Sequence, residues 1–233
     1  MIPKGQESLK SPAWLNDKKY YHNQGDTTYE GENSIYGDFS GLDDIDTDSP
    51  EVVQGMIDIF KNVTSEFKPD GFRIDTIKHV NMAFWAEFAP ALVNHAQELG
   101  IPEFVMFGEV YSGDSEELRS FTTEGKMQSV LDFSMQFALQ DTLIKQQGTD
   151  KLVELFERDH YYNDSDSNAN QLLNFTGNHD MGRFASMLKD SVLNYSEAAI
   201  IQRTLLAPRD GLLSTWCANC LLWRRTRFCW RCW

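Results

Sequence analysis

Apolar side chains recur at helical spacing between residues 51 and 67, where the sequence reads EVVQGMIDIFKNVTSEF. The positions that share this spacing are Val52, Val53, Met56, Ile59, Phe60 and Val63. Ser49 and Pro50 directly precede the run, in the order typical of a helix N-cap and a first helical residue. We therefore predict a helix over 51–67. Residues 1–50 are polar and rich in turn-forming residues, and predict an irregular segment anchored by aromatic side chains.

Short apolar runs alternate with helical patterns along the rest of the chain. The runs that we predict as strands are DGFRIDTIK (70–78), EFVMFGEVY (103–111), SVLDFSM (129–135) and QLLNFTGNHD (171–180). The helical patterns cover 81–100, 141–159 and 196–207. Strands that alternate with helices are typical of a parallel sheet, either open or closed into a barrel. The sequence therefore predicts an α/β fold.

Length and charge narrow the choice of partners. The chain has 233 residues and a formal net charge of -14, and a single α/β barrel needs roughly 250 residues. The negative charge argues against binding to nucleic acid or to an anionic membrane surface. No apolar run approaches the roughly 20 residues of a membrane span. The charge fits a neutral or cationic ligand, or simply a need for solubility.

The last residues depart from this pattern. The run DGLLSTWCANCLLWRRTRFCWRCW holds every cysteine and four of the six tryptophans. The pairs Cys217/Cys220 and Cys229/Cys232 have the spacing of two zinc knuckles, although the eight residues between the pairs are fewer than usual. The abrupt change in charge and in Trp and Cys usage instead favours an out-of-frame translation of residues 209–233. Both interpretations stay open.

Three carboxylates, Asp75, Glu109 and Asp180, each lie at or near the end of a predicted strand. They are 34 and 71 residues apart, and one strand–helix unit takes roughly 30 or more residues. In a barrel, the ends of successive strands converge on one mouth, where active sites are built. A retaining glycosidase needs a carboxylate nucleophile and a carboxylic acid roughly 5–5.5 Å apart. Arg73, two residues before Asp75, would face the same side of its strand and keep that carboxylate ionised.

Each of these residues also has an ordinary structural interpretation. Arg73 and Asp75 alone are consistent with a structural ion pair. Asp180 alone is consistent with a helix cap, His179 with a core histidine, and Glu109 with a solvated loop charge. The periodic placement of all three carboxylates is what favours catalysis.

Four short motifs resemble the conserved regions of the α-amylase family of glycoside hydrolases, the family 13 type. GFRIDTIKHV at 71–80 resembles the second region, FGEVY at 107–111 the third, and FTGNHDMGR at 175–183 the fourth. GLDDIDTDSP at 41–50 resembles the signature near the end of that family's domain B. The motifs stand in the family's order, and the resemblance covers essentially residues 12–208.

The resemblance implies a role for each matching residue. Asp75 would be the nucleophile, with Arg73 as its electrostatic partner. Glu109 would be the general acid/base. Asp180 would stabilise the transition state by binding sugar hydroxyls, with the help of His179.

Substrate and metal ligands are implied in the same way. Lys78 and His79 would line the leaving-group side of the site. The substrate would be an α-glucan or maltooligosaccharide, most simply α-1,4-linked. A calcium ion would be held by the carboxylate of Asp44 and the main-chain carbonyl of His79, because such oxygen ligands suit Ca²⁺.

The implied fold is a (β/α)₈ TIM barrel with domain B inserted after its third strand. Residues 1–50 would be the C-terminal part of domain B, and residues 51–208 a partial barrel of about strands four to seven. The family's first region is absent, so we expect an incomplete and inactive chain. Two alternatives remain: a non-catalytic sugar-binding or transporter-associated relative, and an exo-acting α-glucosidase or transglycosylase.

Overall fold

A computed structural model describes residues 5–187. Two compact units are present: residues up to 106 together with 124–127, and residues 107–123 together with those from 128 onwards. The predicted helix 196–207 and the cysteine-rich residues 209–233 lie outside the described part of the chain. Within that part, no helix has the length and apolar character needed to cross a membrane.

The N-terminal segment of the first unit is irregular, as predicted. Its short helical turns are η1 (Ala13–Asn16), η2 (Lys18–Tyr20) and α1 (Asn33–Tyr36). An isolated antiparallel bridge joins Tyr21 to Ile45. The predicted aromatic anchoring is visible at Trp14, whose ring meets that of Tyr20 edge-on with centroids 5.4 Å apart.

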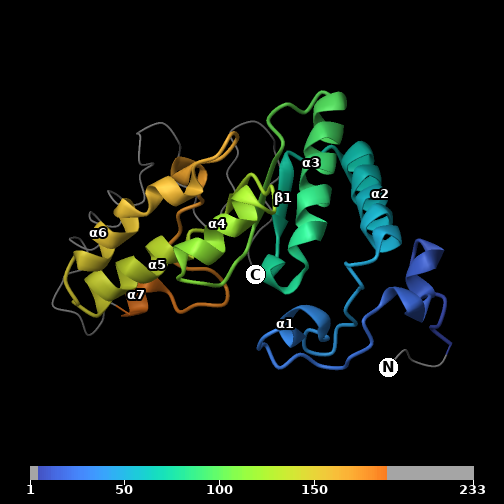
Figure 1. Ribbon diagram of the computed structural model, residues 1–233, viewed down its shortest axis with the longest axis horizontal. Helices are drawn as coiled ribbons and strands as arrows, with labels where there is room; N and C mark the ends of the chain where they lie inside the picture. Colours follow the sequence, from blue (N-terminus) through green and yellow to red (C-terminus); the bar gives the residue numbers. More distant parts are fainter. Residues whose placement is uncertain (1–4, 188–233) are drawn as a thin grey trace. The chain divides into compact units, whose positions relative to one another are not determined.

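Two long helices form the body of the first unit, α2 (Pro50–Phe67) and α3 (Met82–Glu98), and they lie side by side (Figure 1). The helix predicted over 51–67 is therefore confirmed. Pro50 is its first residue, and the N-cap is Ser49, whose hydroxyl makes no capping hydrogen bond. Aromatic rings fill the space between the helices and the adjoining strand: Phe60 packs edge-on against Phe72 and Phe88, with centroids 5.5 and 5.4 Å apart.

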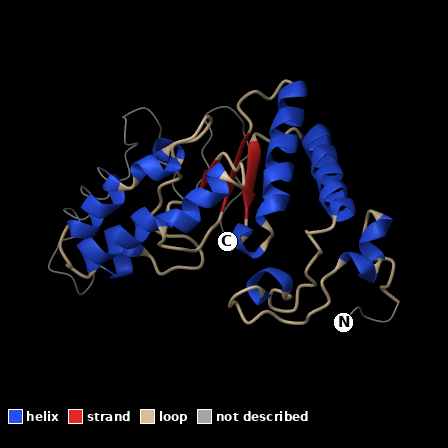
Figure 2. Ribbon diagram, in the orientation of Figure 1, coloured by secondary structure: helices blue, strands red, loops and turns tan. Residues whose placement is uncertain are grey.

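The three strands are β1 (Gly71–Ile74), β2 (Val105–Gly108) and β3 (Ser129–Val130), drawn in red in Figure 2. They are hydrogen-bonded in the order β1-β2-β3. β2 and β3 are parallel, with Phe107 opposite Ser129 and Gly108 opposite Val130. The predicted parallel pairing is confirmed for this pair. At the start of β1, a Cβ atom on Gly71 would lie 1.9 Å from the Val105 carbonyl oxygen, so only glycine fits there.

Two predicted strands are wrong in extent. The run 129–135 leaves the strand after Val130 because the Asp132 carboxylate accepts a hydrogen bond from the Met135 amide at 2.9 Å and begins helix α5 (Phe133–Leu139). In the run 171–180, the described backbone makes one isolated parallel bridge, between Leu173 and Leu131. The turn η6 (Ala169–Gln171) directly precedes it.

The predicted helix 141–159 is also divided. A π-helical turn, η4 (Gln140–Ile144), continues α5, and α6 (Asp150–Glu157) begins after a break. The second unit further contains α4 (Ser115–Thr123), η5 (Asp159–Tyr162) and α7 (Phe184–Met187). One apolar core joins α5, η4, α6 and α7, and its buried members are Met135, Ala138, Leu139, Leu143, Leu152, Leu155 and Phe184.

Candidate active site

Asp75 is the residue that follows β1. Its Oδ1 atom lies 3.1 Å from Nη1 of Arg73, and the two side chains are 62% and 32% exposed. The predicted ion pair is therefore present in the first unit. A guanidinium beside a carboxylate favours the ionised form, which is the form that a nucleophile requires.

The turn after Asp75 is fixed by α3. Thr76 adopts a left-handed conformation (φ 48°) and leads into the turn η3 (Ile77–His79). The indole nitrogen of Trp85 donates a hydrogen bond to the Ile77 carbonyl at 2.9 Å, and both side chains are buried. α3 thereby holds the backbone that presents Lys78 and His79.

His79 is tied to the N-terminal segment. Its Nδ1 atom lies 2.8 Å from the Ser34 carbonyl oxygen. Its ring packs edge-on against Phe39 and Tyr29, with centroids 5.2 and 6.0 Å apart. These contacts connect the motif at 71–80 to the N-terminal segment.

Glu109 is the residue that follows β2, and it is only 5% exposed. The side-chain amide of Asn178 donates to its Oε1 at 3.4 Å. The side-chain oxygen of Asn178, Oδ1, accepts a hydrogen bond from the backbone N–H of Asp180 at 3.0 Å. Asp180 and His179 are exposed, with His179 Nε2 3.2 Å from Asp180 Oδ2. The loop 178–180 and Glu109 therefore lie together in the second unit.

An apolar cluster, largely aromatic, packs beneath Glu109 at the end of β2 and beneath the loop 178–180. Its buried members are Leu131, Phe133 and Phe175, against which Phe107, Phe137, Leu173 and Met181 pack. Phe107 stands two residues before Glu109, and Phe175 and Met181 flank the loop 178–180. Packing therefore fixes both the end of β2 and the two ends of the loop.

Asp75 belongs to the first unit, and Glu109 and Asp180 to the second. Convergence of the three carboxylates on one site stays a prediction. Asn178 was not singled out from the sequence, although it stands inside the motif at 175–183. Trp85 carried no signal beyond its place in an amphipathic helix.

Asp44, the expected calcium ligand, is hydrogen-bonded to a histidine of the N-terminal segment. Its Oδ2 atom accepts a hydrogen bond from His22 Nδ1 at 2.6 Å. Burial raises the pKa of the Asp44 carboxyl, and the bond from His22 opposes that rise. Among the residues described, the acidic cluster that could hold a metal consists of His22, Asp46 and Asp48, without Asp44.

Comparison with known proteins places this geometry in context. Residues 3–214 match the family model for the catalytic domain of alpha amylase. The chain belongs to the α-amylase family. An α-amylase of Streptomyces lividans is 43% identical over 213 residues, which is 91% of this chain and 23% of that protein. A beta/alpha-amylase of Paenibacillus polymyxa is 30% identical over 171 residues, 71% of this chain and 13% of that protein.

Solved α-amylase structures share the fold. The Geobacillus thermoleovorans enzyme, solved with acarbose, superposes with a TM-score of 0.71 at 27% identity, over 84% of this chain and 44% of that one. An Anoxybacillus α-amylase gives a TM-score of 0.70 at 27% identity, over 84% and 43%. The chain thus spans less than half the length of these relatives. Its described residues form an α/β arrangement with parallel strands, similar to part of these TIM-barrel proteins.

Proposed function

We propose that this chain carries the catalytic residues of a retaining glycoside hydrolase that acts on α-1,4-glucans. The observation that carries the proposal is the environment of Glu109: a buried carboxyl directly after a parallel strand, hydrogen-bonded by Asn178. A carboxyl group withdrawn from water is suited to hold a proton for the leaving group. The α-amylase relatives support the choice of substrate.

The proposed reaction uses two carboxyl groups in two steps. Glu109 donates its proton to the glycosidic oxygen while the Asp75 carboxylate attacks the anomeric carbon, so the C–O bond breaks and a glycosyl ester forms. Glu109, now a carboxylate, then takes a proton from water, whose oxygen displaces Asp75. Arg73 keeps Asp75 ionised between turnovers. Asp180 and His179 bind sugar hydroxyls and stabilise the positive charge of the ring.

We assign the remaining parts by the same resemblance. Residues 1–50 would belong to domain B and residues 51–208 to about strands four to seven of the barrel, with Lys78 and His79 beside the leaving group. A calcium ion held by Asp44 and the His79 carbonyl would stabilise the contact between residues 1–50 and the motif at 71–80. The hydrogen bond from His22 uses one lone pair of Asp44 Oδ2, so the ion would bind through the remaining lone pairs of the carboxylate.

The test is to introduce Asp75→Asn and Glu109→Gln, separately, into the protein encoded by the whole reading frame that contains this chain. Each variant should lose at least about 10³-fold in kcat on an α-glucan, because each removes one of two required carboxyl groups. Asp58→Asn, an exposed change on α2, is the matched control and should leave kcat unchanged. Substantial activity in either variant would remove that residue from the mechanism.

Two further readouts separate this function from its alternatives. NMR of fresh product should show the α-anomer first, because two displacements retain configuration. Calorimetry should show that both variants still bind acarbose, which distinguishes lost chemistry from lost folding. Binding of acarbose without hydrolysis by the unsubstituted protein would instead favour a non-catalytic sugar-binding relative. Release of single glucose or transfer products would favour exo-acting or transglycosylating chemistry.

A further inference from the structure

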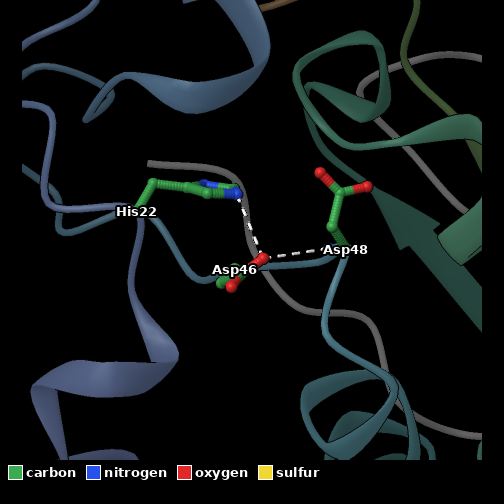
Figure 3. Close-up of side chains that lie close together, drawn as sticks. All are labelled: His22, Asp46 and Asp48. Carbon is green, nitrogen blue, oxygen red and sulfur yellow. Dashed lines mark hydrogen bonds and ion pairs between the residues drawn. The ribbon is translucent and has the colours of Figure 1, made fainter.

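A histidine and two aspartates of the N-terminal segment, none of them among the candidate catalytic residues, lie close together (Figure 3). One ligand atom from each of His22, Asp46 and Asp48 lies within 4.8 Å of the others. The backbone brings them together: the His22 amide donates to the Asp44 carbonyl at 3.1 Å, and the Asp46 amide to the Tyr20 carbonyl at 2.9 Å. This pairing sets residue 22 beside residues 44–46.

The imidazole of His22 is held in one orientation. Its Nδ1–H donates to Asp44 Oδ2 at 2.6 Å, and its ring packs edge-on against Tyr36 with centroids 4.9 Å apart. A metal-binding histidine typically donates its second ring N–H to a carboxylate, which fixes the tautomer and makes the ligating nitrogen more basic. Asp44 provides this support, and the lone pair is then on Nε2.

The Nε2 atom faces the cluster from a buried position. The His22 side chain is 9% exposed. Among the residues that the structure describes, Nε2 makes no hydrogen bond; it contacts Asp46 Oδ1 at 3.3 Å, a dashed line in Figure 3, which is an ion pair only if the ring is protonated. A buried polar atom that makes no hydrogen bond destabilises the fold unless something else satisfies it. Such an atom, facing two carboxylates, is an arrangement that a cation bound between the three groups would stabilise.

Hydrogen bonds also hold the carboxylates of Asp46 and Asp48 in place. The Asp48 amide donates to Asp46 Oδ1 at 3.2 Å. The side-chain amide of Asn81, the N-cap residue of α3, donates to Asp48 Oδ1, and its carbonyl oxygen accepts the Thr47 hydroxyl at 2.9 Å. Hydrogen bonds of this kind orient metal-binding carboxylates.

We propose that His22, Asp46 and Asp48 form a divalent-metal site that takes Zn²⁺, with Asp44 as the residue that positions His22. One imidazole nitrogen and carboxylate oxygens suit zinc, whereas Ca²⁺ takes oxygen ligands. The site is therefore different from a calcium site at Asp44 and the His79 carbonyl. Three protein ligands leave a position for water. The ion would tie the start of α3 to the segment around His22.

Zinc binding can be measured on all 233 residues by isothermal titration calorimetry. The four cysteines at 217, 220, 229 and 232 are replaced by serine in every protein compared, because thiolates would compete for the ion. One zinc ion should bind per chain, and excess Ca²⁺ should not displace it. His22→Gln and Asp46→Asn should abolish binding, and Asp44→Asn should weaken it about 10–100-fold. His160→Gln, at an exposed histidine of η5, is the control and should bind like the parent.

Two measurements keep the result independent of misfolding. Zinc should raise the Tm of the parent and the control but not that of His22→Gln, with circular dichroism reporting whether each is folded. Imidazole ¹⁵N NMR should show His22 protonated at Nδ1, with its Nε2 signal shifted by zinc. The proposal is overturned if folded His22→Gln binds zinc as the parent does. It is equally overturned if His22 stays protonated on both nitrogens at neutral pH with zinc present. A doubly protonated imidazole cannot bind a metal and would instead form ion pairs with Asp44 and Asp46.

Discussion

Asn178 donates a hydrogen bond to Glu109 across 69 residues of sequence, with 3.4 Å between Nδ2 and Oε1. The other end of the same amide accepts the backbone N–H of Asp180 at 3.0 Å. One side chain therefore couples the residue after β2 to the loop that carries Asp180. A change in the position of this loop would therefore alter the hydrogen bond that Glu109 accepts.

The first prediction concerns this coupling and depends on the proposed function. Asn178→Ala should lower kcat on an α-glucan by about tenfold, the equivalent of about 1.4 kcal/mol, because Glu109 loses a donor and the loop loses its anchor. Asn163→Ala, at an exposed asparagine after η5, should have no effect. Steady-state kinetics on soluble starch check both. An unchanged kcat in the Asn178 variant would show that the hydrogen bond does not position Glu109.

The second prediction compares two helix N-caps. Asp132 is fully buried and its side chain caps α5, whereas the Ser49 hydroxyl at the start of α2 makes no capping bond. Asp132→Ala should therefore lower the free energy of unfolding by about 1–2 kcal/mol, and Ser49→Ala by much less. Urea unfolding followed by circular dichroism measures both. Equal losses in the two variants would contradict the assignment of the cap.

The third prediction concerns the contact between β1 and β2. Gly71→Ala should destabilise the first unit by about 1–3 kcal/mol or more, because the added methyl would meet the Val105 carbonyl oxygen at 1.9 Å. Gly182→Ala is the matched control, since a Cβ atom there meets nothing within 4 Å. Thermal unfolding should give a lower Tm for the first variant alone. A wild-type Tm for Gly71→Ala would mean that the strands are farther apart than described.

The fourth prediction concerns acid stability. Lys145 and Lys151 donate hydrogen bonds to Asp141, the first at 2.7 Å, and lower the pKa of its carboxyl. A carboxyl with a lower pKa in the folded state stabilises the fold above its unfolded pKa, and that contribution disappears as the pH falls through the folded pKa. Asp141→Asn should therefore destabilise the protein at about pH 7 and have little effect near about pH 2.

Urea unfolding of Asp141→Asn and of the parent at both pH values tests this expectation. The exposed substitution Asp58→Asn serves as the control, and its effect should stay small throughout. A difference between Asp141→Asn and the parent that does not shrink in acid would assign the loss to packing rather than to charge.

Hydrophobic periodicity predicted the elements whose pattern extends over several turns or a whole strand. α3, β1 and β2 lie within their predicted ranges, and α2 begins one residue before its predicted start. Both helices bury apolar side chains of the predicted pattern. The run 129–135 failed because its alternation is short and Asp132 offers a cap that starts a helix instead. The run 171–180 failed because side-chain packing on Phe133 and Leu131, not a strand ladder, places it.

The candidate site residues that belong to short sequence motifs could be predicted from the sequence. The motifs supplied Asp75, Glu109 and Asp180 as candidates, and their catalytic roles stay predictions. The amide of Asn178 was missed because its partner is distant in sequence. His22 was missed because only tertiary structure brings it to Asp44 and Asp46.

The aromatic cluster beneath the loop 178–180 has a consequence for protein engineering. The described backbone of residues 171–180 makes one isolated bridge and accepts side-chain hydrogen bonds from Ser129 and Gln136. The packing of Phe133, Phe175 and Met181 adds to these few ties, in place of a longer strand ladder. We therefore do not expect the loop 178–180 to keep its conformation when it is transferred alone to another protein. Grafting it onto another scaffold would require the rings beneath it to be transplanted as well, because they pack against both of its ends.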